Sequence, residues 1–527
     1  MLESAANVSE SEEKEQRDGR AAAPVDQSIL EGSSSRGGCQ LQMYDGEACG
    51  RPIHTAPAHD AKPVCLMHSR DPEKSDAAFQ EEFEAILKAA GNDVADFTKF
   101  IFTKADYWRR EITAACVFRD TVFTQKAYFS NAKFTRNADF GWATFTQYAH
   151  FGGATFARKA YFNNAKFKQN ANFYSATFTQ NANFSDATFT QDADFIKATF
   201  TQGANFQEGT LAQNAGFGGA KFMQEARFAG TKFLGAAEFR ETKFRGHDKD
   251  RKERAQEFLP GPVFSLAEFS QPEKIIFYRT YLGQALFHNC DVSKVTFSSV
   301  KWGEREGKRM VFEEEVDLAA DFAEALRPAE GSSDERNYGL IAELYQQLKK
   351  NYDERKDYWT AGDFHYGEME MKRLTSRRKN KVLRWLVQNL RLVAWYRWAS
   401  EYGESYLRPA LWLATILLGF ALLYPVAGLH YDSSKDPHVV RGAPQTSELL
   451  TYWDPFVPGQ ASTSRHKAQW RLLGHSCVTA LDVATFQRDR TYEPAYPWGR
   501  LLLLLEILLV PTLFGLFLLA VQRQFRR

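Results

Sequence analysis

The chain has 527 residues, and its 66 Lys and Arg nearly balance its 65 Asp and Glu to a formal charge of +1. A chain of this length is expected to contain several domains. Its six cysteines show no even framework of pairs, which disfavours a secreted scaffold held by disulfides. The composition is ordinary except for 43 Phe, and most of this excess falls in one regular pattern in the first half of the chain.

Residues 1–38 are rich in Ser, Glu and Gly and poor in apolar side chains. We expect this segment to be a disordered tail, because it cannot bury enough apolar surface to fold. It also lacks the apolar core of a secretory signal peptide.

Four candidate metal ligands lie within residues 39–70, namely Cys39, Cys49, Cys65 and His68. The Cys65-x-x-His68 spacing lets two ligands share one ion. Three thiolates and one imidazole form a closed tetrahedral zinc site, which is structural because no coordination position stays open. A segment this short has little core of its own, so a metal would organise it. His54 and His59 are alternative ligands, and three free thiols beside an incidental histidine are the alternative interpretation.

Residues 71–94 are predicted to contain an amphipathic helix. Phe79, Phe83, Ile86 and Leu87 fall at helical spacing, and Gly91 is a stop signal. We expect this helix to cap the repeat domain that follows it, because the open end of a stacked structure must be covered.

Residues 95–302 contain the most regular pattern of the chain. From Phe118 to Phe244, Phe recurs at spacings that alternate between five and six residues, with Leu211 in one of the places. A small residue, mostly Ala, stands two positions before almost every Phe, as in the near-copies ATFTQNANFSD, ATFTQDADFIK and ATFTQGANFQE at 176–208. Neither a helix face nor a strand face has this period. Fixed self-similarity predicts a solenoid, whose units bury their apolar face by stacking on their neighbours.

This pattern resembles the pentapeptide-repeat family, in which Leu or Phe is the centre residue and Ala precedes it by two. The resemblance implies a right-handed, quadrilateral β-helix in which two eleven-residue units make one coil. The positions from Phe118 to Phe244 then fill six coils, after an irregular start. The charged stretch at 246–262 is expected to be an insertion, and a strict spacing of five from Phe277 to Trp302 adds one or two coils. Cys116 and Cys290 occupy small-residue positions, so we expect both to be buried packing residues.

Residues 95–245 carry 19 Lys and Arg against 12 Asp and Glu, a net charge of about +7. Some members of the family that this pattern resembles imitate DNA with an acidic surface, and the positive sign disfavours that role here. A basic face is also able to contact nucleic acid or anionic lipid. We favour a mixed, solvated surface and do not expect a nucleic-acid partner.

Residues 303–400 are predicted to be a helical linker. It comprises a short helix at 311–326, a helical hairpin at 334–374 and an interfacial helix at 382–398. In the hairpin Ile341, Leu344, Tyr345 and Leu348 share one face, whereas His365 and the nearby Glu368 and Glu370 do not form an HExxH pattern and are expected on a packed helical surface. Residues 382–398 alternate apolar and cationic positions and contain three Trp, as in a helix that lies at a membrane interface.

Residues 401–527 are predicted to be a membrane domain with two spans. The segments 409–429 and 501–521 are long and apolar enough to cross a bilayer, and residues 430–499 form the loop between them. Positive charge before the first span and after the second places both termini in the cytoplasm and the loop outside. We therefore expect a multi-pass protein of a cell membrane, the inner membrane of a bacterium.

A semi-apolar segment at 470–486 precedes the second span, and this layout resembles the pore of two-helix cation channels. The place of the selectivity filter holds ATFQRDR at 484–490, and the backbone carbonyls of that sequence do not suit a filter. Glu506 lies about 8–10 Å into the second span. A carboxylate there is costly, so it either lines a pore, bonds to the neighbouring helix, or reaches the outer interface.

The sequence contains no phosphate-binding loop, nucleophile elbow or HExxH motif, so we do not expect an enzyme. The favoured function is a membrane-anchored protein that displays a cytoplasmic solenoid for binding or scaffolding. Its partners would be the lipid bilayer and an unidentified cytoplasmic protein. The alternative is a channel-like or sensor protein that assembles as a homo-oligomer and has a degenerate selectivity filter.

Overall fold

A computed structural model describes residues 38–54, 60, 62–245, 261–328, 334–375, 381–432, 447–450, 462–485 and 492–526. These residues belong to two compact units, Met1–Ser75 and Asp76–Arg527. The expected tail up to residue 37, most of the expected insertion at 246–262, and much of the predicted loop at 430–499 lie outside the described residues.

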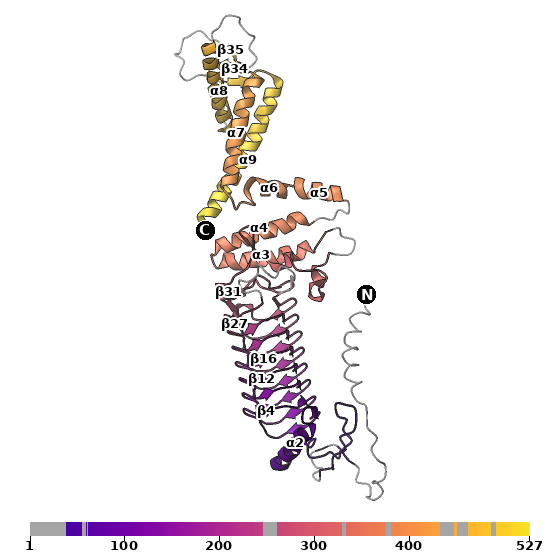
Figure 1. Cartoon of the computed structure of the whole chain (residues 1–527). Coiled ribbons are helices and arrows are strands. Elements are labelled where there is room, and N and C mark those ends of the chain that lie inside the picture. The colour runs from indigo at the N-terminus through magenta and orange to yellow at the C-terminus, as the bar shows by residue number, and fades with distance from the viewer. Residues whose placement is uncertain are drawn as a thin grey trace. The chain divides into compact units, whose positions relative to one another are not determined.

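Four parallel sheets, one for each face, form the solenoid of the second unit (Figure 1). The first contains β1 (Val94–Asp96), β5 (Ala115–Val117), β9 (Ala138–Asp139), β13 (Ala160–Tyr161), β17 (Ala182–Asn183), β21 (Ala204–Asn205), β25 (Ala226–Arg227) and β28 (Pro262–Val263). The second contains β2 (Ile101–Phe102), β6 (Val122–Phe123), β10 (Thr144–Phe145), β14 (Lys166–Phe167), β18 (Thr188–Phe189), β22 (Thr210–Leu211), β26 (Lys232–Phe233) and β29 (Glu268–Phe269). The third contains β3 (Ala105–Asp106), β7 (Ala127–Tyr128), β11 (Ala149–His150), β15 (Ala171–Asn172), β19 (Ala193–Asp194), β23 (Ala215–Gly216), β27 (Ala237–Arg240), β30 (Ile275–Tyr278) and β31 (Thr296–Ser298). The fourth contains β4 (Glu111–Ile112), β8 (Lys133–Phe134), β12 (Thr155–Phe156), β16 (Thr177–Phe178), β20 (Thr199–Phe200) and β24 (Lys221–Phe222), and a short 3-10 helix, η3 (Pro272–Lys274), precedes β30.

Identical residues stack on one another through the regular part of this solenoid. Ala149 pairs with Ala171 and Phe156 with Phe178, because two eleven-residue units complete one coil. The rings of Phe162 and Phe184 are therefore parallel, with their centroids 4.9 Å apart and their planes 2° from each other. This distance equals the separation of hydrogen-bonded strands, about 4.7–4.9 Å. The repeat Phe fill the axis out of contact with solvent, as the spacing predicts.

The two Phe spacings correspond to two kinds of corner. In a five-residue step the second residue after Phe has a left-handed backbone, as at Ser175, Asp186, Lys197 and Glu208 with φ between 54° and 58°. The six-residue step from Phe178 to Phe184 turns without a left-handed residue and uses one more residue to do so. The alternation of five and six residues is therefore the alternation of a tight corner and a wide one.

Two features of the solenoid differ from the expectation or refine it. The segment 95–117, expected to be irregular, forms a regular first coil in which Val94 pairs with Ala115. The longest sheet accordingly has nine strands, more than the six coils plus one or two that the Phe count predicts.

The strict spacing of five near the end is confirmed as a change of register, since Phe277 pairs with Phe297 after twenty residues. Cys116 and Cys290 are buried at 1% and 4% exposure, as expected.

Helix α2 (Asp76–Ala90) covers the first coil (Figure 1). Its two buried residues, Phe79 and Phe83, pack on rings of that coil, and the Phe83 and Phe97 centroids are 4.6 Å apart. An ion pair from Arg110 to Glu84 fixes the helix across the coil. The apolar face that the sequence pattern assigns to this helix therefore meets the exposed end of the Phe axis.

The other end of the solenoid leads into a β-hairpin, β32 (Gly303–Arg305) and β33 (Lys308–Met310), and two 3-10 helices, η4 (Phe312–Glu314) and η5 (Asp321–Leu326). The prediction of one helix over 311–326 is therefore wrong. The chain is bound instead to the last coils, because the fully buried Glu313 accepts hydrogen bonds from the backbone N–H groups of Phe287 and His288 at 2.6 and 3.1 Å. These contacts outweigh local helix preference.

Helices α3 (Tyr338–Glu354) and α4 (Tyr358–Leu374) form the predicted hairpin, and α3 closes this end of the solenoid (Figure 1). Asn351 donates to the carbonyl oxygens of Val292 and Val295, both at 2.8 Å. Arg355 donates to the carbonyl of Val295 at 2.8 Å and to that of Phe297 at 3.0 Å. Side chains of α3 thus replace the next coil as hydrogen-bond partners of the last one.

Two shorter helices follow the hairpin, α5 (Lys381–Leu390) and α6 (Leu392–Ser400). The predicted interfacial helix is therefore divided near Arg391. Large apolar side chains project from both helices into solvent, with Leu392 87% exposed and Trp385, Trp395 and Trp398 each about 60% exposed.

The last part of the chain consists of α7 (Leu407–Ala427), α8 (Ser462–Ala484) and α9 (Pro497–Arg526), with a three-stranded antiparallel sheet of β34 (Leu429–Asp432), β35 (Ser447–Leu450) and β36 (Tyr492–Pro494). Helices α7 and α9 are long and apolar enough to cross a membrane. The segment predicted as an external loop contains α8, which packs along α7: Ala480 shares a buried cluster with Phe420, Ala421 and Tyr424.

We predict that Asn351→Ala destabilises the chain, because it removes the side-chain donor of the Val292 carbonyl and one of the two side-chain donors of the Val295 carbonyl. The free energy of unfolding should fall by about 2 kcal/mol. The measurement is chemical unfolding of the full chain in detergent. Lys350→Ala, at a neighbouring side chain that is 63% exposed, is the matched control. Equal stability of the two variants would show that α3 does not close the solenoid in this way.

Candidate functional site

Three thiols and one imidazole meet in the first unit, and they are the four ligands that the sequence predicts. The ligand atoms of Cys39, Cys49, Cys65 and His68 all lie within 4.8 Å of one another. The Cys49 and Cys65 sulfurs are 3.8 Å apart, and His68 Nδ1 is 3.5 Å from the Cys39 sulfur and 3.1 Å from the Cys65 sulfur. Cys39, Cys65 and His68 are buried, so this cluster can hold a metal ion away from water.

Backbone hydrogen bonds bring these ligands together. Cys39 and Cys49 lie on the two arms of a short hairpin, since Cys49 donates to the Leu41 carbonyl at 2.8 Å and Gly50 to the Cys39 carbonyl at 2.9 Å. Gly50 has a φ of +67°, which only glycine adopts readily, and it turns the chain directly after its ligand. Cys65 and His68 lie on one turn, closed by the hydrogen bond from the His68 N–H to the Cys65 carbonyl.

The thiols are electrostatically coupled. The hydrogen bond from Cys65 lowers the pKa of Cys49 to about 3, and Arg51, which donates to the Cys49 sulfur at 3.3 Å, acts in the same direction. The Cys49 thiolate in turn raises the pKa of Cys65, to which burial also contributes. If the cluster held a cation, one sulfur of the pair would bind it as a thiolate and the other would first have to lose its proton.

Of the two alternative ligands, His54 does not join this cluster. His54 Nε2 lies 3.6 Å from a carboxylate oxygen of Asp71. His59 lies outside the described residues.

Glu506 lies at the contact between α7 and α9. Its side chain is fully buried, and Tyr424 of α7 donates a hydrogen bond of 2.5 Å to its carboxylate. Val510, Leu513 and Ala520 are buried on the same side of α9. Of the roles that the sequence leaves open for Glu506, this geometry corresponds to a bond with the neighbouring helix.

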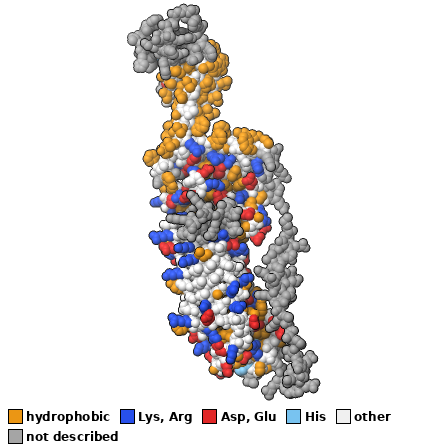
Figure 2. Space-filling view, in the orientation of Figure 1, with side chains coloured by type: hydrophobic (Ala, Val, Ile, Leu, Met, Phe, Trp, Pro, Cys, Tyr) orange, Lys and Arg blue, Asp and Glu red, His pale blue; other side chains and the backbone are white. Residues whose placement is uncertain are grey.

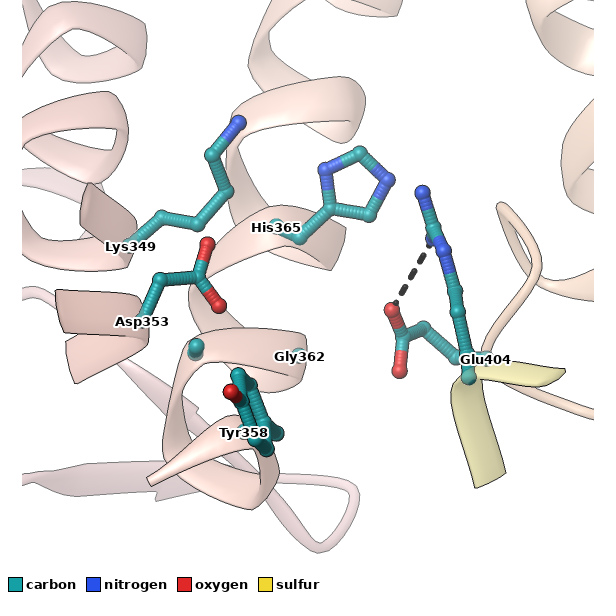
Figure 3. A pocket seen from close by; sticks show the side chains of 8 residues that line it. Lys349, Asp353, Tyr358, Gly362, His365 and Glu404 are labelled. Atoms are coloured by element: carbon teal, nitrogen blue, oxygen red, sulfur yellow. Dashed lines mark hydrogen bonds and ion pairs between the residues drawn. The ribbon is translucent and has the colours of Figure 1, made fainter. Parts of the chain in front are cut away.

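A charged cavity of about 420 Å³ lies where the α3–α4 hairpin meets the ends of α7 and α9 (Figure 3). Lys349 and Asp353 contribute from α3, His365 from α4, Glu404 from the connection before α7, and Arg523 from α9. Ala361 and Gly362 leave room on α4, and Tyr358 closes one side. In Figure 3 the carboxylates of Asp353 and Glu404 face the hollow from opposite sides, and the His365 ring projects into it.

The charges around this cavity are connected. Arg523 donates to the Tyr402 carbonyl at 2.8 Å and lies 3.3 Å from Glu404, which ties α9 to the start of α7. Glu368 accepts hydrogen bonds from Lys349 at 2.6 Å and from Lys372 at 2.5 Å. Burial opposes ionisation of Glu368, but hydrogen bonds from His365 and the two lysines prevail and hold the pKa of that carboxyl well below its usual range.

Residue spacing does not predict this cavity, because its residues come from segments that are far apart in the chain. Glu404 and Arg523 are separated by 119 residues. The available signal is topological: if both long apolar helices cross one membrane, the start of the first and the end of the second must lie on the same side. The interpretation of His365 and Glu368 as part of a packed surface overlooked the hollow next to them.

Comparison with known families concerns the solenoid. The family model for pentapeptide repeats (9 copies) matches residues 118–166 and 162–210. None of the curated proteins matches the chain. The match does not extend to residues 401–527, so the likeness of that region to a channel pore has no support from a family. Together with the 22-residue register and the stacked Phe, the match identifies the solenoid as one built of pentapeptide repeats.

Proposed function

We propose that the chain is a membrane-anchored protein that presents its solenoid as a binding surface to another protein. The observation that carries this proposal is the exposure of α7 and α9. Only 28% and 17% of their most apolar windows are buried by the rest of the chain. A core helix of a water-soluble protein is mostly buried, and Figure 2 shows hydrophobic side chains covering this part of the molecule. Lipid is the solvent that satisfies such a surface.

Helices α5 and α6 support the same anchoring. Their exposed Trp385, Trp395 and Trp398 carry both an apolar ring and a polar N–H, which suits the boundary between lipid and water. Arg384 and Arg391 lie among them in the sequence and favour an anionic surface. We infer that these helices lie on the bilayer on the side of the solenoid.

The solenoid offers its sides for recognition. Helix α2 covers its first coil and α3 its last, and the Phe axis between them is dry. Recognition is therefore left to the four faces, which carry regular rows such as Thr155, Thr177 and Thr199 on the fourth sheet. Flat faces with a fixed period of side chains suit the docking of a protein.

For the metal cluster we propose zinc in a structural role. Around a tetrahedral zinc ion two sulfur ligands lie roughly 3.8 Å apart, and a sulfur and a nitrogen roughly 3.5 Å. The Cys49–Cys65 and Cys39–His68 distances, 3.8 and 3.5 Å, have these values, whereas Cys65–His68 is shorter at 3.1 Å. With all four positions occupied by protein, the ion would hold the first unit together and would not act on a substrate.

The channel-like alternative has less support. Glu506, the residue that would line a pore, is fully buried against Tyr424 within the chain. The other side chains that face outward from the middle of α9 are mainly Leu and Phe, which suit lipid. We therefore do not propose ion conduction.

The first prediction from this proposal concerns the topology of the chain in the membrane. A cysteine that replaces exposed His430, in a Cys477→Ser background, should react with a membrane-impermeant maleimide in intact cells. Glu354→Cys on α3 should react only after the membrane is opened, because it lies on the side of the solenoid. Equal labelling of both positions in intact cells would contradict the proposed anchoring.

The second prediction concerns the metal. The purified full chain should contain about one equivalent of zinc, because the four ligands form one closed site. Cys49→Ser should lose most of it, and Cys477→Ser, at an exposed cysteine of α8, should retain it. Metal analysis by mass spectrometry gives the ratio, and a zinc content in the unchanged chain that equals that of Cys49→Ser would refute the assignment.

The third prediction concerns the solenoid faces. A photoreactive residue at exposed Thr179 or Thr190, in the full chain within cells, should yield a discrete cross-linked adduct with a second protein. The same residue at Leu508, 67% exposed on α9, reports membrane neighbours and serves as control. Adducts that are identical for all three positions, or confined to Leu508, would exclude these faces as the binding surface.

A further inference from the structure

The charged cavity between α3, α4 and α9 has the size and the charge pattern of a binding site. Its volume of about 420 Å³ falls within the range of small-molecule sites, about 300–1,000 Å³. It is lined by charged and polar groups from three separate parts of the chain, which is typical of a site assembled by folding and not of a gap within one helical hairpin.

One side of the cavity can receive an anion. Lys349 and Lys372 both form ion pairs with Glu368. Because Glu368 carries a single negative charge, it compensates only one of these two positive charges. His365 Nδ1 lies 3.8 Å from Glu368, and its buried Nε2 has no hydrogen-bond partner among the described residues. Arg523 brings a guanidinium to the same cavity. A phosphate accepts hydrogen bonds from ammonium, imidazole and guanidinium donors alike.

The other side can receive a cation. Asp353 forms no ion pair with a residue in the described part of the chain, and its carboxylate faces that of Glu404 across the hollow (Figure 3). A purely anionic ligand would approach two carboxylates, which is unfavourable. A ligand with a phosphate at one end and a primary ammonium at the other would satisfy both sides.

We propose that this cavity binds a zwitterionic phosphoethanolamine group. The phosphate would contact Lys349, His365 and Arg523, and the ammonium would lie between Asp353 and Glu404. Such a group occurs as a lipid headgroup and as a soluble phosphodiester. The lipid source rests on the proposed membrane anchoring, since Arg523 and Glu404 lie where α9 ends and α7 begins. The binding chemistry itself does not depend on the anchoring.

The test uses the full chain in a phosphate-free detergent and isothermal titration calorimetry with three soluble probes: glycerophosphoethanolamine, glycerol phosphate and ethanolamine. Glycerophosphoethanolamine should bind at least about tenfold more tightly than either fragment, because each fragment leaves one charged side of the cavity unmatched. Asp353→Asn should weaken its binding about tenfold and remove most of its advantage over glycerol phosphate. Glu354→Gln, at the adjacent exposed residue, should leave all three affinities unchanged.

Lipid nanodiscs distinguish the two sources. If the source is lipid, the chain in nanodiscs that contain phosphatidylethanolamine should no longer bind the soluble probe, whereas the chain in phosphatidylglycerol nanodiscs should bind it. If the source is soluble, both nanodiscs should leave binding intact. Absence of binding to all three probes, or equal binding of glycerol phosphate that Asp353→Asn does not change, would overturn the proposal. Neither result would bear on membrane anchoring, which the labelling of position 430 tests separately.

Discussion

The stacking of Phe on Phe at the separation of β-strands is the constraint on which the second unit depends. Successive rings such as Phe178 and Phe200 lie 4.8 Å apart and within 1° of parallel. Rings from opposite faces meet edge to face, as Phe173 does with Phe184 at 87°. Ala fills the remaining positions, since a larger side chain there would force the coils apart. This packing has no natural end, because each coil exposes a ring and a row of backbone groups that the next coil would cover.

The two ends are closed by different means. Helix α2 covers the first coil with aromatic rings, which continue the stack through Phe83 and Phe97. At the last coil Asn351 of α3 and Arg355, the residue directly after this helix, donate to carbonyls that no further coil covers. A buried carbonyl without a donor costs about 1–3 kcal/mol, so several such bonds together are needed for a closed end. Closure also keeps the solenoid from adding strands of another chain.

Periodicity predicted the parts of this fold that repeat. The four-faced solenoid, the N-terminal helix and the α3–α4 hairpin follow from spacing, because one missed position changes little in a pattern of many copies. The four clustered ligands followed from their residue types and the Cys65-x-x-His68 spacing. Single long-range contacts carry no such signal. The pairing of Glu313 with the N–H groups of Phe287 and His288 replaced the expected helix over 311–326, and the cavity between Asp353, Glu404 and Arg523 exists only once distant segments meet.

Helix α3 links the end of the solenoid to the base of the apolar helices, because it uses two faces at once. Asn351 and Tyr352 face the last coil, where Tyr352 accepts a hydrogen bond of 2.9 Å from Trp302. Lys349 and Asp353, one turn apart from each other, face the cavity. A movement of the solenoid that keeps the hydrogen bonds of Asn351 must therefore carry Lys349 and Asp353 with it, relative to Glu404 and Arg523. The shape of the cavity thus depends on how the solenoid is held, and a ligand that contacts both α3 and α9 favours one such arrangement over the others.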